Sequence, residues 1–434
     1  RETARAFGIP EEEIAAVVRG HRARRDPEGP PEDGTTWREI ARVARRIAGL
    51  PRHLSVHVGG IVITPGPVEE LAPVETANDG STLLAWDKDG AEKAGLVKID
   101  LLGNRSLAVV RDALADLRDN GVAIDPFAWD PLNDGDTRRL LARGDSIGVF
   151  YVESPAMRQL QKKTGRGDFE HLVIHSSIIR PAANRFIAEY VRRLKGKEYA
   201  PLHPRLDRIL AETYGIMCYQ EDVSKVAVAL AGFSDADADG LRKILTKKNR
   251  EKRLAAYRER FYEGALGRGV EAAAIDEIWS MIRSFDGYSF CKAHSASYAM
   301  VSFQSACLKA HHPAEFMAAV LSNGGGYYSS GAYISEARRM KLSVGGPDVN
   351  ESELRYRGRG NEIRVGLMAV AGLSTATLRA MLHERARGGP FASAEDYVAR
   401  VAPTEGDLVA LAGAGAFDAL LGGMRRFEQL RELL

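Results

Sequence analysis

The sequence predicts an α+β protein of several domains, in which a mixed segment of short strands and helices precedes a mainly helical stretch. The chain has 434 residues, which is too long for one ordinary domain and fits about two to four. Hydrophobic residues make up 45% of it, enough to build real cores. Strand-like runs lie before about residue 100, whereas helical periodicity dominates from about residue 130.

Residues 1–129 combine both kinds of element. Residues 1–50 have the pattern of two amphipathic helices around a Pro/Gly-rich loop, Pro27–Gly34. Val56–Thr64 and Leu83–Trp86 are predicted strands, with turn residues at Pro65–Pro67 and Asn78–Gly80 between them. A further short strand ends at Asp100, and a helix from about Ser106 to Asn120 stops at Gly121.

Residues 130–324 are predicted to be mainly helical, with Gly and Pro between segments. Gly324–Gly326 is a predicted hinge or loop. The clearest helical patterns cover Phe186–Leu194, Asp222–Ala231, Asp235–Leu245 and Lys252–Gly264.

Residues 325–434 begin with a predicted helix at about Gly331–Met340, a turn at Pro347–Asn350 and a small β segment. Two Gly-rich hairpins follow, Gly366–Ser374 before a helix and Leu411–Phe417. A lone turn of this kind is usually only a turn, but glycines in tandem hairpins can let backbone N–H groups approach a phosphate.

Charge is distributed unevenly along the chain. The net charge is only +2, yet Met157–Arg260 holds 22 Lys and Arg against 13 Asp and Glu. Such a basic block indicates a polyanionic partner, although a solvated helix face has the same composition.

Other patterns exclude several classes of protein. No apolar run approaches the roughly 20 residues of a membrane helix, and no GxxxxGK[ST] loop is present. Three cysteines without CxxC spacing argue against disulfides and structural zinc and favour a reducing cytoplasm. His53 and His57 are four residues apart, but no Cys or third ligand is near, so we reject a zinc site there.

The run Gly95–Gly103 is the most informative short segment. Asp100 ends an apolar strand, and Lys98 lies two residues earlier on the same strand face. A carboxylate beside an ammonium at the rim of a sheet suits metal-assisted phosphoryl chemistry. An Asp after a strand is also common as a turn or helix cap, so the segment alone does not decide.

Four further segments follow this run in a fixed order. Together they form the series Val97–Gly103, Gly148–Pro155, Ser176–Pro181, Gly215–Glu221 and Phe285–Ala299. This series resembles the alpha subunit of bacterial DNA polymerase III. These are the C-family replicases and their error-prone relatives. The resemblance extends from Arg1 to Leu434. It implies a partial mixed α/β palm at 1–129, mainly helical fingers at 130–324, and a tandem helix-hairpin-helix region at 325–434.

The resemblance also implies parts that this sequence lacks. The family's palm carries three metal-binding aspartates, and the Pro-Asp-x-Asp pair that supplies two of them is not found here. Its N-terminal phosphoesterase-like domain and its clamp-binding modules are not found either. With Arg1 as first residue, we expect an internal fragment that is inactive by itself.

The resemblance implies roles for individual residues. Asp100 corresponds to the third metal-binding aspartate, for Mg²⁺, and Lys98 to a basic palm residue that faces phosphate. Arg180 falls in a segment that closes over the nucleotide, although Ala182–Ala183 follows where many members have Gly-Pro. Further nucleotide or phosphate contacts are expected at Tyr219, Gln220, Arg242, Lys243, Lys247, Lys248, Lys292 and His294, and DNA contacts at Gly372, Ser374, Gly413 and Gly415.

The implied function is template-directed DNA synthesis from dNTPs on a primer–template, in replication or translesion repair. The expected partners are primer–template DNA, dNTPs, and a sliding clamp with other replisome or repair subunits, and no membrane is expected. The alternative is a non-catalytic DNA-binding fragment that keeps the basic fingers. The sequence leaves open whether the role is replicative or error-prone.

Overall fold

The computed structural model describes residues 1–23, 35–50, 56–57, 59–77, 79–101, 103–125, 128–180, 182–245, 251–285, 291–324, 326–422 and 424–433. They form two compact units, Arg1–Gly103 and Asn104–Leu434. The predicted loop Pro27–Gly34 lies outside the described residues, as does Asn78 of the predicted turn.

The first unit mixes short helices with two-stranded sheets, which agrees with the predicted α+β class. Strands β1 and β4 pair antiparallel, and so do β2 and β3. Its elements are α1 (Glu2–Ala6), α2 (Glu11–Ala23), α3 (Thr35–Ile47), β1 (Gly60–Val62), β2 (Val74–Thr76), β3 (Thr82–Leu84), α4 (Lys88–Lys93) and β4 (Lys98–Asp100), with a 3-10 turn at Val68–Glu70.

The predictions for this unit were partly wrong. The described part of residues 1–50 has the two predicted helices, α2 and α3, and a third, α1, that was not predicted; the three bury a small core of Ala4, Ile14 and Ile40. Strand β1 covers Gly60–Val62, which are three residues inside the predicted strand Val56–Thr64. Strand β2 was missed because all three of its residues are exposed, so no alternation of apolar and polar residues marks it.

The second unit is mainly helical, as predicted. Its elements are α5 (Arg105–Asp119), α6 (Gly135–Ala142), α7 (Pro155–Thr164), α8 (Phe169–Ile178), α9 (Asn184–Leu194), α10 (Pro204–Leu210), α11 (Gln220–Val226), α12 (Asp235–Ile244), α13 (Glu251–Leu266), α14 (Ala272–Arg283), α15 (Lys292–His311), α16 (Pro313–Asn323), α17 (Ser330–Arg339), β5 (Ser343–Gly345), β6 (Arg357–Arg359), β7 (Glu362–Arg364), α18 (Thr375–Gly388), α19 (Ala394–Val401), α20 (Glu405–Ala414) and α21 (Arg426–Leu433).

Local sequence signals explain many of these helix ends. Helix α7 begins after Ser154, whose hydroxyl accepts the N–H of Met157, and Pro155 occupies the first helical position. It ends at Gly165, which adopts φ 65°, a conformation that glycine reaches without steric strain. Helix α11 continues into a π-helical turn, Ala227–Ala231, so the predicted helix Asp222–Ala231 is confirmed as one segment with a change of hydrogen bonding.

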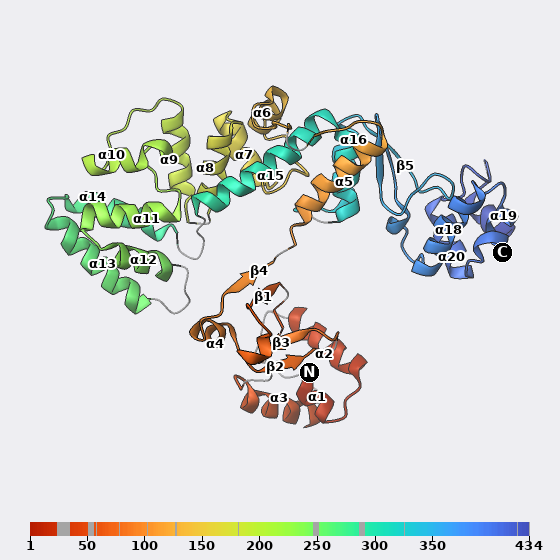
Figure 1. Cartoon of the computed structure of the whole chain (residues 1–434), viewed down its shortest axis with the longest axis horizontal. Coiled ribbons are helices and arrows are strands. Elements are labelled where there is room, and N and C mark those ends of the chain that lie inside the picture. The colour runs from red at the N-terminus through yellow and green to blue at the C-terminus, as the bar shows by residue number, and fades with distance from the viewer. Residues whose placement is uncertain are drawn as a thin grey trace. The chain divides into compact units, whose positions relative to one another are not determined.

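Helices α15 and α16 form the centre of the second unit. Figure 1 shows the long helix α15 passing beside α8 toward α16 and α5. Residues 314–322 of α16 are all buried, because α5, α15, α17 and the strands β6 and β7 surround that helix. The sheet has the order β5-β7-β6, with β5 parallel to β7 and β6 antiparallel to it.

Helices α18 to α21 have a separate hydrophobic core that includes Met381, Tyr397 and Phe417. The division between the two compact units falls at 103/104, because α5 packs on α16 and β6. The palm boundary at residue 129 stays a prediction. No helix in the described ranges is both long and apolar enough to cross a membrane.

Candidate functional site

The strand pair β1–β4 holds Asp100 and Lys98 side by side. Gly60 pairs with Asp100 and Val62 with Lys98. A side chain at Gly60 would meet the Lys98 side chain at 2.7 Å, so glycine makes room for that ammonium to reach Asp100. Lys98 and Asp100 form an ion pair, and Nδ1 of His57 lies 3.8 Å from the same carboxylate. The hydrogen bond from Lys98 lowers the pKa of Asp100.

Asp100 by itself does not fit a magnesium site. Mg²⁺ prefers several oxygen ligands in octahedral geometry, and one carboxylate oxygen of Asp100 already contacts the Lys98 ammonium. Among the described residues, the only group of three potential metal ligands found close together lies elsewhere, at Asp134, Cys307 and His311. The described residues therefore offer one carboxylate where two-metal chemistry needs several.

The second unit organises most of the other predicted residues around the start of α11. The segment from Ile216 to Tyr219 is buried. It is fixed by Asp222, whose carboxylate accepts the backbone N–H groups of Cys218 and Tyr219, both at 2.8 Å. Burial raises the pKa of Asp222 to about 6, although these two hydrogen bonds oppose the rise. A buried carboxylate thus sets the position of the Tyr219 backbone.

Arg180 follows α8 and reaches the same segment. Its Nη2 donates to the carbonyl oxygen of Met217 at 3.0 Å, and its guanidinium lies 3.7 Å from the centroid of the Phe285 ring. Only 3% of Arg180 is exposed, and its Nε and Nη1 have no hydrogen-bond partner in the described part of the chain. Burial lowers the pKa of Arg180 to about 10. The residue is therefore a buried cation with two unused donors, next to Pro181, which is outside the described residues.

Gln220 and Arg242 are brought together across α11 and α12. Nη1 of Arg242 donates to Oε1 of Gln220 at 2.9 Å, and its Nη2 lies 2.6 Å from Oδ1 of Asp239. Lys243 pairs with the other oxygen of Asp239 at 2.7 Å. Sequence reasoning had missed Asp239, which neutralises part of this basic cluster. The predicted residues Lys247 and Lys248 lie outside the described residues.

Lys292 completes the group from the start of α15. Its Nζ lies 2.6 Å from Oε2 of Glu212 and 5.5 Å from the centroid of the Tyr219 ring. Tyr219 is 3% exposed, and its hydroxyl has no partner within the described ranges. A pocket of about 400 Å³ adjoins these side chains, lined by Ile209, Glu212, Thr213, Tyr219, Glu221, Asp222, Lys225, Lys292, Ala293 and Ala296.

His294 lies apart from that pocket lining and contacts Tyr298, with 4.0 Å between the ring centroids. Tyr298 also packs edge-on against Tyr151, which has a left-handed backbone conformation at φ 63°. Glu212 and Lys225 were not predicted as site residues. Both are exposed or half-buried charges on helices, and nothing in the sequence marks them.

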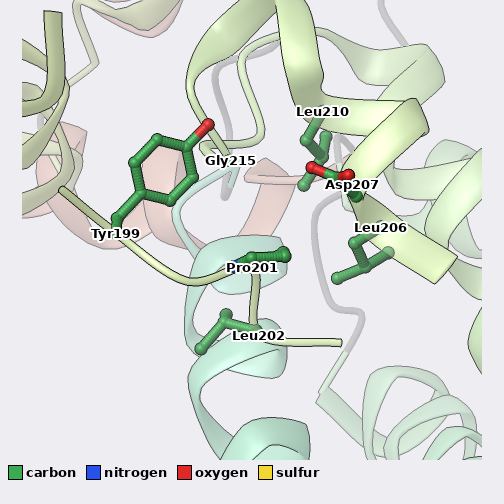
Figure 2. A pocket seen from close by; sticks show the side chains of 7 residues that line it. All are labelled: Tyr199, Pro201, Leu202, Leu206, Asp207, Leu210 and Gly215. Atoms are coloured by element: carbon green, nitrogen blue, oxygen red, sulfur yellow. The ribbon is translucent and has the colours of Figure 1, made fainter. Parts of the chain in front are cut away.

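A much smaller cavity lies beside Gly215, the residue just before the buried segment Ile216–Tyr219. Figure 2 shows Tyr199, Pro201 and Leu202 facing the α10 side chains Leu206, Asp207 and Leu210 across it. Its volume of about 10 Å³ has room for about one water molecule, so it is too small for a nucleotide.

The C-terminal hairpins differ from the expected pattern. Gly372 adopts φ 87°, as a tight turn requires, and Ser374 caps α18. However, the N–H of Ser374 donates to Asp407 at 2.6 Å and its hydroxyl to the same carboxylate at 3.1 Å. An internal carboxylate therefore occupies the donors that would face a DNA phosphate.

The second predicted hairpin, Leu411–Phe417, covers the end of α20 and the turn that follows it. Gly413 lies inside that helix, and its carbonyl accepts Nη1 of Arg426 at 2.9 Å. Gly415 ends the helix with φ 82°, and its N–H donates to Ala412. The Gly-rich composition there reflects a helix C-cap, a role that glycine fills as readily as a hairpin.

The geometry therefore describes a helical protein in which one buried cation, two more exposed cations and aromatic rings are grouped at one helix start. Three family models match it: the bacterial DNA polymerase III alpha NTPase domain at residues 1–103, the alpha subunit finger domain at 106–269, and a helix-hairpin-helix motif at 341–427. The chain belongs to the bacterial DNA polymerase III alpha-subunit family.

Curated relatives carry two names. An error-prone DNA polymerase of Anaeromyxobacter dehalogenans is 39% identical over 89% of this chain and 36% of the relative. A DNA polymerase III subunit alpha of Thermus aquaticus is 35% identical over 100% of this chain and 38% of the relative. An error-prone DNA polymerase of Symbiobacterium thermophilum is 36% identical over 91% and 39%. The chain thus spans little more than a third of these relatives.

Proposed function

We propose that this chain is the core part of a DNA polymerase that extends a primer from dNTPs on a template, with the second unit holding the incoming nucleotide. The observation that carries this proposal is the grouping of Arg180, Tyr219, Gln220, Arg242 and Lys292 around the start of α11. These residues come from four separate segments. Family membership supports the same reading, because the finger-domain model covers four of the five residues.

The chemistry of the group suits a triphosphate. Guanidinium groups form bidentate hydrogen bonds to phosphate oxygens, and Arg180 has two buried donors without partners among the described residues. Arg242 and Lys292 are held by carboxylates, Asp239 and Glu212. A bound triphosphate would compete with these carboxylates for the cations, which are already gathered in place.

We also propose roles for Asp100 and Lys98, the predicted palm residues of the first unit. Asp100 would supply one metal-binding carboxylate, with Lys98 beside it, and Mg²⁺ would require further carboxylates that the described residues do not provide near it. When bound, such ions activate the primer oxygen and neutralise the leaving pyrophosphate.

A primer-extension assay tests the proposal. We expect no synthesis by the 434-residue chain and Mg²⁺-dependent synthesis by a polypeptide extended to the length of its relatives. In the extended protein, Arg242→Gln should raise the KM for dNTPs. Arg139→Gln is a matched control, because Arg139 pairs with Asp136 three residues earlier at 2.5 Å, as Arg242 does with Asp239 at 2.6 Å.

The alternative, a non-catalytic DNA-binding fragment, predicts a different result. Neither polypeptide would then extend a primer, while salt-sensitive binding to DNA would remain. Both proposed functions, the polymerase and the DNA-binding fragment, include primer–template DNA as a partner. A sliding clamp and other replisome or repair subunits are proposed only for the polymerase, and binding of the extended protein to an isolated clamp would test that part.

A further inference from the structure

Three side chains that metal ions favour meet where the end of α15 faces the start of α6. Cys307 and His311 are four residues apart on α15, so they share one face of the helix. Asp134 caps α6. One ligand atom of each residue (a sulfur, an imidazole nitrogen and a carboxylate oxygen) lies within 4.8 Å of the other two. This arrangement has no part in the nucleotide site described above.

We propose that Asp134, Cys307 and His311 bind one Zn²⁺ ion, with water as the fourth ligand. Zinc accepts sulfur, nitrogen and oxygen donors in tetrahedral geometry, whereas Mg²⁺ and Ca²⁺ prefer oxygen donors only. Nε2 of His311 and Oδ1 of Asp134 are 3.0 Å apart, close enough for both to contact one ion at normal zinc distances.

The surroundings hold the three ligands in place without the ion. Both the backbone N–H and the hydroxyl of Thr137 donate to Oδ1 of Asp134, each at 2.6 Å. The Trp129 side chain, an N–H donor, also hydrogen-bonds the Cys307 thiol. Contacts of this kind orient metal ligands, and their loss usually weakens metal binding.

An ion could reach the site from solvent. The side chains of His311 and Asp134 are 39% and 27% exposed, while Cys307 forms the buried wall at 8%. On binding, the thiol loses its proton to solvent and Nε2 of His311 offers its lone pair, so two negative ligands neutralise the divalent charge. The ion would also lie at the C-terminus of α15, where the helix dipole favours a cation.

Sequence spacing could not have revealed this site. Asp134 and His311 are 177 positions apart, so no short motif joins them. CxxC pairs and clustered histidines contain only ligands that are near each other along the chain, so the absence of such patterns in the sequence does not exclude this zinc site. The ion would connect α6 to the end of α15 and thereby stabilise the central part of the second unit.

The test is titration of the chelator-treated 434-residue chain with Zn²⁺ and with Co²⁺, which reports thiolate ligation by its absorption. We expect one ion per chain, a sulfur-to-cobalt charge-transfer band, and a rise in Tm with Zn²⁺. Cys307→Ser and His311→Gln should each weaken binding at least about tenfold. Cys291→Ser and His312→Gln, which leave the three ligands intact, should bind as the wild-type chain does.

Binding that is unchanged in Cys307→Ser and His311→Gln would overturn the proposal, as would an absent thiolate band. If these variants fail to fold, X-ray absorption of the zinc-loaded wild-type chain decides the matter. One sulfur together with nitrogen and oxygen neighbours supports the site, and a shell of nitrogen and oxygen alone rejects it.

Discussion

Arg180 rests its guanidinium on the ring of Phe285, 3.7 Å from the centroid, while Nη2 donates to the carbonyl of Met217. The stacking and the single hydrogen bond hold a buried cation whose Nε and Nη1 find no partner in the described ranges. Such a group is unfavourable for folding unless a ligand uses it, because a buried charge needs compensating hydrogen bonds.

The burial of Arg180 predicts that one substitution, Arg180→Met, has opposite effects on stability and on nucleotide binding. Arg180→Met keeps much of the side-chain volume and removes the buried charge, so the Tm of the 434-residue chain should stay the same or rise. In the polymerase extended to full length, the same change should raise the KM for dNTPs. A large fall in Tm with an unchanged KM would contradict the role of Arg180 in nucleotide binding.

Asp222 should make stability depend on pH. Its pKa is raised by burial to about 6, above its ordinary value of 3.8. Because the folded pKa is the higher one, the stabilising contribution is complete below the unfolded pKa and is lost as pH rises through 6. The substitution Asp222→Asn removes the ionisable group, and the amide oxygen that it introduces can still accept the two backbone N–H groups.

The unfolding free energy of Asp222→Asn, relative to wild type, should therefore increase by roughly 2 to 3 kcal/mol between about pH 4 and pH 7. Urea denaturation of both proteins across that range measures it. Other titrating groups cancel in the difference. A flat difference would mean that Asp222 titrates at its ordinary pKa.

Lys309 should be essential for folding of the second unit. Its ammonium is fully buried and donates to the carbonyls of Asp145 and Ile147 and to Glu336, the last at 2.7 Å. Lys309→Met leaves Glu336 with Arg339 as its remaining charged partner and takes the Lys309 donor away from both carbonyls, so it should lower the unfolding free energy by about 3 kcal/mol. Arg387→Ala, at an ion pair whose arginine is exposed, should change it by less than about 1 kcal/mol. Equal effects in denaturant titrations would refute the prediction.

Ser374 should matter more for stability than for DNA affinity. Its hydroxyl caps α18 and contacts Asp407, so Ser374→Ala should lower the unfolding free energy by about 1 kcal/mol. Because Asp407 already accepts the Ser374 N–H, DNA binding measured by fluorescence anisotropy should change little. A clear drop in affinity at constant stability would instead support the phosphate contact predicted from the sequence.

Substitution of Asp100 tests whether this residue binds metal in the predicted palm. Its side chain is 48% exposed, accepts a hydrogen bond from Lys98 and lies near His57, so Asp100→Asn, whose amide oxygen can still accept from Lys98, should leave the fold of the first unit intact. In the extended polymerase the same change should abolish nucleotide addition. Circular dichroism and primer extension measure the two properties, and retained synthesis would exclude Asp100 as a metal ligand.

The sequence predicted the helices well wherever apolar periodicity and caps agreed. Helix α9 and helix α12 were placed within two residues of their observed ends, because Ser234 and the apolar spacing mark them locally. Strand β2 was not predictable, since an exposed three-residue strand depends on its partner β3 and not on a pattern of its own.

The site was predictable in its members but only partly in its electrostatics. Tyr219, Gln220 and Lys292 could be proposed from motifs, whereas Glu212 could not, because it meets Lys292 from 80 positions away. Asp239 lies three residues before Arg242 and four before Lys243 on α12, so helical spacing could have predicted these two ion pairs. Burial of Arg180 likewise depends on Phe285, which the sequence places more than a hundred positions downstream.

The long-range contacts of α5 affect how the chain is made. Nδ2 of Asn120, at the end of α5, donates to Glu315 and to the carbonyl of Gly358, which are 195 and 238 positions further along. A ribosome therefore completes α5 long before α16 and β6 exist to cover it. Because apolar surface exposed during synthesis promotes aggregation, we expect α5 to need chaperone protection until that stretch has emerged.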